Sequence, residues 1–99
     1  MAMLGGRLVL FGGSAGGPAP LDDTWTFDGT QWLELFSPGP SPRENHSMAT
    51  SGQRVIVFGG RNLSQDLGDT WAFDGSNWTE LKLLPTPSPR HDAAMATLP

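Results

Sequence analysis

The side chains that could do chemistry in this chain are few, and most of them occur in matched pairs. Asp28 and Asp74 each precede a glycine, while Glu34 and Glu80 each follow a tryptophan by two residues. Carboxylates can act as general acids and bases or hold a metal ion. An Asp directly before Gly in a hairpin, however, accepts backbone hydrogen bonds from its own turn. We therefore predict turn stabilisation for the two Asp residues, and solvated or ion-paired positions for the two Glu residues.

The other candidates for catalysis or ligand binding fit known chemistry poorly. His46 and His91 are the only histidines, and the absence of cysteine excludes disulfides and thiolate metal sites. One repeat length before His91 stands Glu44, so the histidines cannot form a symmetric metal site. The sequence contains no Ser-His-Asp arrangement and no nucleophile elbow. No Lys-Ser or Lys-Thr follows the glycines at 12–17, as a phosphate loop requires. We predict no catalytic residues, no metal site and no cofactor.

Composition narrows the class of protein further. The 99 residues are enough for one small domain, and 13 Gly and 9 Pro beside 37% hydrophobic residues favour an all-β fold with many short strands. The net charge of -4 argues against nucleic-acid partners and against binding to an anionic membrane surface. The first seven residues lack the basic start and apolar core of a signal peptide. We expect a soluble protein, and the sequence predicts no particular compartment.

Almost the whole sequence consists of two copies of one unit. The segment 7–13 (RLVLFGG) returns as 54–60 (RVIVFGG), and 23–29 (DTWTFDG) returns as 69–75 (DTWAFDG). A second Trp and a Pro-Ser-Pro-Arg run also recur, and the offset between copies is 46 or 47 residues. It changes because the loop after the glycine pair is one residue shorter in the second copy. Constant strands with variable loops are typical of stacked structural repeats.

Each unit is predicted to form four short antiparallel strands. In the second copy we expect them over 46–50, 53–58, 69–73 and 78–81. The β-branched run before Gly59-Gly60 predicts a strand buried on both faces, and the paired glycines end it. Asp74-Gly75 predicts a hairpin, and the prolines of 85–89 form a rigid connector to the next unit.

This order of motifs resembles the kelch repeat, in the form common in bacterial kelch proteins. The resemblance covers essentially the whole chain and implies an all-β fold of two four-stranded antiparallel β-propeller blades. In kelch relatives the Arg after Pro bonds the backbone or acids of a neighbouring blade, which implies a structural role for Arg43 and Arg90. Phe27 and Phe73 occupy aromatic positions that are often Tyr in the family. The repeat positions are Gly12, Gly13, Trp25, Asp28, Gly29, Trp32, Arg43, Gly59, Gly60, Trp71, Asp74, Gly75, Trp78 and Arg90.

The strands that each repeat contains lead to a prediction about assembly. We expect residues 1–36 to form the second, third and fourth strands of one blade, and 43–82 to form a whole blade. The resemblance implies rings of six or seven blades, whereas two blades would leave apolar flanks exposed. Because Met95-Ala96 repeats Met1-Ala2, residues 90–97 are predicted to complete the first blade of a neighbouring copy. A head-to-tail homotrimer with six blades is favoured, and a dimer or tetramer stays open.

Three functional hypotheses follow from the repeats and their frame. The first is a non-enzymatic scaffold, excised or engineered from a longer kelch protein, that self-assembles by strand exchange into a closed propeller. The second is a binding module for a protein or a carbohydrate, which uses the loop face of the ring. The third is a remnant of a propeller enzyme, although the chain lacks a catalytic residue set. The candidate binding loops run from Ser14 to Leu21 and from Arg61 to Leu67, and the second offers Arg61, Asn62, Gln65 and Asp66.

Overall fold

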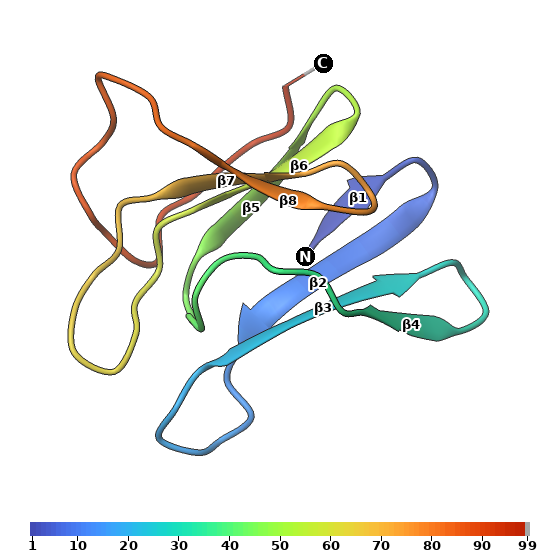
Figure 1. Cartoon of the computed structure of the whole chain (residues 1–99), viewed down its shortest axis with the longest axis horizontal. Helices are drawn as coiled ribbons and strands as arrows, with labels where there is room; N and C mark the ends of the chain where they lie inside the picture. Colours follow the sequence, from blue (N-terminus) through green and yellow to red (C-terminus); the bar gives the residue numbers. More distant parts are fainter. Residues whose placement is uncertain (99) are drawn as a thin grey trace.

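The computed structural model describes residues 1–98, which form two four-stranded antiparallel sheets (Figure 1). No helix occurs in this part of the chain. In each sheet the strands follow one another in chain order, as in a meander. The first sheet comprises β1 (Ala2–Leu4), β2 (Arg7–Gly13), β3 (Leu21–Phe27) and β4 (Trp32–Leu35). The second comprises β5 (Ser47–Ser51), β6 (Arg54–Phe58), β7 (Thr70–Phe73) and β8 (Trp78–Leu81). The predicted all-β fold with two four-stranded antiparallel units is therefore confirmed.

The two sheets repeat each other in register as well as in order. Trp25 of β3 lies opposite Leu10 and Glu34, and Trp71 of β7 lies opposite Val57 and Glu80. The β-branched residues of β6 suit a pleated strand that is packed on its faces. Successive residues along β3 and β7 cover opposite flanks of the sheet, so residues two positions apart share a flank. Each sheet thus has two flanks with equivalent residues in the two copies.

The glycine pairs close the second strand of each sheet in the left-handed region of backbone space. Gly12 has φ of 63° and Gly59 of 68°. A Cβ on Gly12 would lie 2.8 Å from the carbonyl oxygen of Arg43, and one on Gly59 would lie 2.5 Å from that of Arg90. Both positions therefore need glycine for the backbone angle and for the close approach of the connector. The connector is fastened here, through bonds from Gly13 N to the Arg43 oxygen and from Gly60 N to the Arg90 oxygen.

The first sheet differs from the sequence prediction at its N-terminal edge. The repeat frame predicts three strands within 1–36 and no inner strand, but Ala2–Leu4 forms β1 and pairs with β2 through Ala2 opposite Val9. That prediction is wrong because it required the whole Pro-Arg-x-x-His-Ser segment to define the strand. Three residues that alternate correctly suffice when a hydrophobic strand is already available to pair with them. Strands β5 to β8 lie within residues 43–82.

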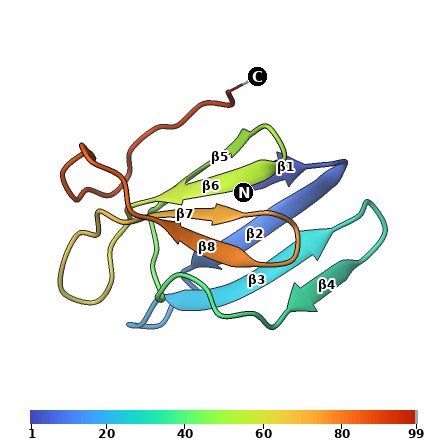
Figure 2. The same cartoon turned by 45° about the horizontal axis from the view of Figure 1, so that its top comes forward.

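The C-terminal segment of residues 90–98 lies along the second sheet of the same chain. Figure 1 and Figure 2 both show it running beside β5, whose other side adjoins β1. It is attached by a backbone bond from Leu98 to Thr50 and by the hydroxyl of Ser47, which donates to the carbonyl of Ala93. Only one isolated parallel bridge, between Ser51 and Leu98, joins it to β5. Within the described residues this segment is not a strand, and its predicted pairing as 90–97 with a neighbouring copy stays a prediction.

The hydrophobic core lies between the two sheets and belongs to neither alone. Val9 and Phe11 of the first sheet meet Val55, Val57 and residues of β7 and β8 in the second. Burial of these aliphatic and aromatic side chains supplies the main favourable term that holds the sheets together, roughly 25 cal/mol per Å² of apolar surface. One flank of each sheet is buried in this contact. Among residues 1–98, no second blade packs on the opposite flank of either sheet, and only the C-terminal segment lies along the second sheet there.

Candidate functional site

The junction between the sheets is organised around the buried guanidinium of Arg43. Its Nη1 and Nη2 donate to the two carboxylate oxygens of Asp69 at 2.7 and 2.8 Å, and Nη1 also reaches the carbonyl of Gly59 at 3.1 Å. The side chain is 0% exposed. A planar guanidinium matches a carboxylate in this bidentate geometry, which adds direction to charge. Arg43 stands on the connector that leaves the first sheet, so it ties that connector to the next sheet.

Asp69 is shared between this arginine and a tryptophan of its own strand end. Its Oδ2 also accepts from Trp71 Nε1 at 2.7 Å. Partial burial alone would raise the pKa of Asp69, but the hydrogen bonds from Arg43 and Trp71 outweigh it, and the pKa lies below its ordinary value. The carboxylate is therefore charged at neutral pH and fully engaged. These contacts tie Arg43 to the second sheet and leave its guanidinium no exposed face.

A second contact across the junction is made by Trp78. Its Nε1 donates to Thr24 Oγ1 of the first sheet at 3.0 Å, and its ring meets Phe11 edge-on with centroids 5.3 Å apart. A Cβ on Gly39 would lie 2.6 Å from Cδ1 of Trp78, so the connector passes directly over the indole. Aromatic pairs of this kind contribute about 1 kcal/mol beyond the area they bury. The tryptophan is only 7% exposed.

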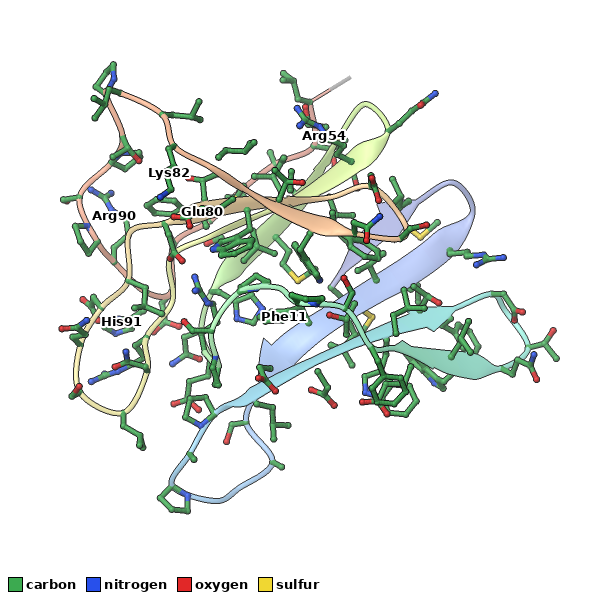
Figure 3. All side chains as sticks on the ribbon, in the orientation of Figure 1. Phe11, Arg54, Glu80, Lys82, Arg90 and His91 are labelled. Carbon is green, nitrogen blue, oxygen red and sulfur yellow. The ribbon has the colours of Figure 1, made fainter. Side chains whose placement is uncertain are left out.

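The repeat partners of these residues lie on the two outer flanks, where no second blade of the described chain packs on them, although Phe58 is only 9% exposed. Trp32, the equivalent of Trp78, is 45% exposed. Asp23 bonds Trp25 Nε1 at 2.7 Å, as Asp69 bonds Trp71, but no arginine among residues 1–98 reaches it. Arg90 is exposed at the periphery, whereas Phe11 lies centrally between the sheets (Figure 3). The flank of the first sheet with Trp32 is called flank 1 below, and the flank of the second sheet beside Arg90 is called flank 2.

The predicted binding loops do gather at one end of the molecule. Residues from both loops and from the connector before Arg43 line one open cavity of about 390 Å³. Its lining consists of Ala19, Pro20, Ser41, Pro42, Asn62, Leu63 and Ser64. Asn62 is occupied within its own loop, since its Oδ1 accepts from the backbone of Ser64 and Gln65. Small apolar and hydroxyl groups therefore dominate, and the cavity has no cluster of charges.

The titratable residues outside the junction do not converge on a reactive centre. Asp66 accepts from His91 Nδ1 at 2.7 Å, while Arg61 bridges to Glu44 through backbone bonds only. Across the described residues, no three side chains of the metal-binding types come together. Burial lowers the pKa of His46 to about 4, with a contribution from the positive charge of Arg43 and against a backbone hydrogen bond with Phe11. His46 is thus a half-buried, neutral imidazole that packs edge-on against Phe11, with ring centroids 5.7 Å apart.

The turn residues behave as the sequence predicts. Asp28 Oδ1 accepts from the backbone of Thr30 and Gln31, and Asp74 makes the corresponding pair of bonds in the second hairpin. These backbone bonds lower the pKa of both carboxyl groups below the ordinary value. Both residues are thus committed to their hairpins, because a carboxylate that accepts two backbone bonds is held in its charged form.

Sequence reasoning missed three residues that build the junction. Asp69, Thr24 and Gly39 each contact a side chain of the other sheet, yet none stood out as functional. One signal was present, because the Asp-Thr-Trp motif recurs with both Asp23 and Asp69. An acid two residues before a tryptophan in every copy indicates a bonded pair. Its arginine partner comes from the connector that leaves the preceding sheet. The sequence of a single unit does not show that these two residues meet.

Two meandering four-stranded sheets that pack flank to flank through repeat-specific residues define a pair of β-propeller blades. Residues 1–98 match the family described as the KLHDC2/KLHL20/DRC7 Kelch-repeats domain. The chain belongs to the kelch-repeat family. Over 63 residues it is 40% identical to an F-box/kelch-repeat protein of Arabidopsis thaliana, a match that covers 57% of this chain and 13% of that protein. The chain therefore spans a small part of the length of this relative. No helix of the described residues is long and apolar enough to cross a membrane.

Proposed function

We propose that this chain is a non-enzymatic scaffold whose two blades associate with further copies of the chain to build a closed propeller. The observation that carries the proposal is the contrast between two equivalent tryptophans, Trp78 at 7% and Trp32 at 45% exposure. The indole of Trp78 is covered because another blade packs on it. Flank 1 presents the same kind of surface without a cover, and flank 2 presents the surface that would receive it.

The surface left open is large enough to favour association. Flank 1 includes Trp32 together with half-buried Leu10 and Phe27. A buried tryptophan removes about 150–250 Å² from water, which at roughly 25 cal/mol per Å² is several kcal/mol. With two blades in each copy, a head-to-tail ring contains an even number of blades. Three copies with six blades are the assembly that we propose first.

Strand exchange is the finer part of this proposal. Residues 95–98 (MATL) repeat residues 1–4 (MAML), and the C-terminal segment already lies beside β5 where a next inner strand would stand. In an assembled ring this segment would pair with β2 of the next copy in place of its β1. A chain truncated after Arg90 tests the exchange without removing the arginine. If the truncated chain assembles as well as the full chain, β1 suffices and exchange is not needed.

Native mass spectrometry and sedimentation velocity of the full chain test the assembly itself. We expect a discrete species of three copies of the 10.6 kDa chain at micromolar concentration. The variant Trp32→Ala should remain folded and lose this species, because it removes the central contact of flank 1. The matched control Phe36→Ala removes another exposed aromatic side chain and should keep it. A wild-type chain that stays monomeric at 200 µM would contradict the proposal.

A second function, binding of a protein or glycan at the loop face, is favoured by the cavity of about 390 Å³ between the loops. Loops on a rigid β-scaffold are the usual place for such contacts. The test is a peptide and glycan array with the wild-type chain. Saturable binding that is lost in Leu63→Asp, and kept in Leu83→Asp on the connector, would support it. Equal binding by both variants would exclude this cavity.

A further inference from the structure

We propose that copies of this chain recognise one another through a defined junction in which Arg90 of one copy binds Asp23 of the next and Trp32 of the next copy docks on flank 2. The inference rests on the proposed assembly and names the residues that specify it. It follows from the one junction that the structure contains, between the first and second sheets. The side chains that build that junction have repeat equivalents on the outer flanks of the two sheets.

Arg90 is already held in the conformation that Arg43 uses. Arg43 donates from Nε to the carbonyl of Ser41 and from Nη2 to its hydroxyl, both at 3.1 Å. Arg90 makes the same two bonds to Ser88, at 3.1 and 2.9 Å. Its Nη1, the atom with which Arg43 reaches Asp69 and Gly59, has no partner among residues 1–98. The guanidinium is therefore preorganised for a bidentate carboxylate that the isolated chain does not supply.

Asp23 is the complementary half of this pair. It stands before Trp25 as Asp69 stands before Trp71, and one carboxylate oxygen accepts from the indole at 2.7 Å in both cases. In Asp69 the second oxygen accepts from Arg43 Nη1, but in Asp23 it has no partner within the described chain. The two half-sites match in charge, in geometry and in repeat position. They lie on opposite flanks, so they can meet only when two blades of different copies pack together.

The apolar part of the junction is also prepared. Trp78 packs on Phe11 and donates to Thr24. On flank 2, Phe58 is the equivalent of Phe11 and Thr70 is the equivalent of Thr24. An open cavity of about 250 Å³ lies beside Phe58 and is lined by Phe58, Pro87, Arg90, Ala93, Ala94 and Met95. Its lining is mainly apolar, which suits an indole ring. In the proposed junction this cavity beside Arg90 accepts Trp32 of the next copy, while Arg90 binds Asp23 of that copy.

The contact between Gly39 and Trp78 cannot form in the same way between two copies. Gly39 passes over Trp78, and a Cβ there would lie 2.6 Å from the ring, but the equivalent position on the second connector is Thr86. That connector is also one residue longer, so it must move away from the indole of the next copy. Relief of this crowding should strengthen association. We expect Thr86→Gly to lower the dissociation constant several-fold, since overpacked contacts cost stability.

The test uses two variants that each break one flank. Arg90→Ala keeps Asp23, while Asp23→Asn keeps an acceptor for Trp25 and removes the charge. Each variant alone should assemble on the order of 100-fold more weakly than wild type, because truncating a desolvated ion pair costs that much. An equimolar mixture retains one intact junction and should give a 1:1 dimer and no ring in sedimentation velocity. Circular dichroism and tryptophan fluorescence verify that both variants fold.

The controls separate this inference from the assembly on which it rests. Asp22→Ala and Arg54→Ala remove an acid and an arginine from exposed positions outside the junction and should assemble like wild type. If wild type assembles and both flank variants do so equally well, the inference is wrong while the proposed function stands. If the variants weaken assembly but their mixture gives no dimer, the head-to-tail pairing is wrong. A wild-type chain that is monomeric at 200 µM overturns both.

Discussion

The two blades carry nearly the same sequence pattern, but their corresponding side chains lie in different environments. Val55, Val57 and Phe73 are fully buried, while their equivalents Leu8, Leu10 and Phe27 are half-buried. The difference arises only because the second blade has a neighbour on that flank. In this chain Val55, Val57 and Phe73 are therefore buried by the neighbouring blade. Burial, ion pairing and tryptophan packing are properties of the contact between successive blades, as expected for repeat architectures.

The largest effect should come from removing the tryptophan at the occupied junction. Trp78→Ala should lower the free energy of unfolding by about 4 kcal/mol, since it empties a packed aromatic site and leaves Thr24 without its donor. Urea denaturation followed by circular dichroism measures this. Trp32→Ala, measured on the dilute monomer, should cost less than about 1 kcal/mol because the indole is already exposed. Equal costs at the two positions would contradict the comparison of the blades.

Substitution of Arg43 should likewise lower the free energy of unfolding more than substitution of Arg90. Arg43→Ala leaves Asp69 partly buried without its cation and should cost about 3 kcal/mol, whereas Arg90→Ala in the monomer should be close to neutral. The contribution of Asp69 is lost as pH falls through its lowered pKa, because the carboxyl must be protonated there. Denaturation midpoints of both variants at pH 7 and pH 3 measure this. The gap between them should narrow at pH 3.

A smaller effect should appear in the pH dependence of the free energy of unfolding. The pKa of His46 lies at about 4 in the folded chain, below its ordinary value of 6.5, so the unfolded chain takes up the proton first. Stability is therefore complete above pH 6.5 and falls between pH 6.5 and 4, by about 2 kcal/mol after allowance for the partial exposure of the ring. Thermal unfolding across this range measures the slope. His46→Asn should flatten it.

The sequence predicted the fold well because its signals are local and occur twice. Strand order, hairpins and the roles of Asp28 and Asp74 depend on residues a few positions apart, and the duplicated pattern located them. The junction could not be predicted in the same way. Arg43 and Asp69 are 26 residues apart, and nothing in either unit specifies which sheet supplies the partner. The inner strand β1 was missed because three residues carry too little periodicity to define a strand.

The connector arginine is held by its backbone to the blade it leaves and by its side chain to the blade that follows. The carbonyl of Arg43 accepts from Gly13 of the first sheet, while its guanidinium binds Asp69 of the second. The length and planarity of this side chain therefore help to fix the angle between the two blades, together with the packed core. In the closed propeller proposed above, this angle would set the number of blades. A shorter cation such as Lys would relax that angular constraint.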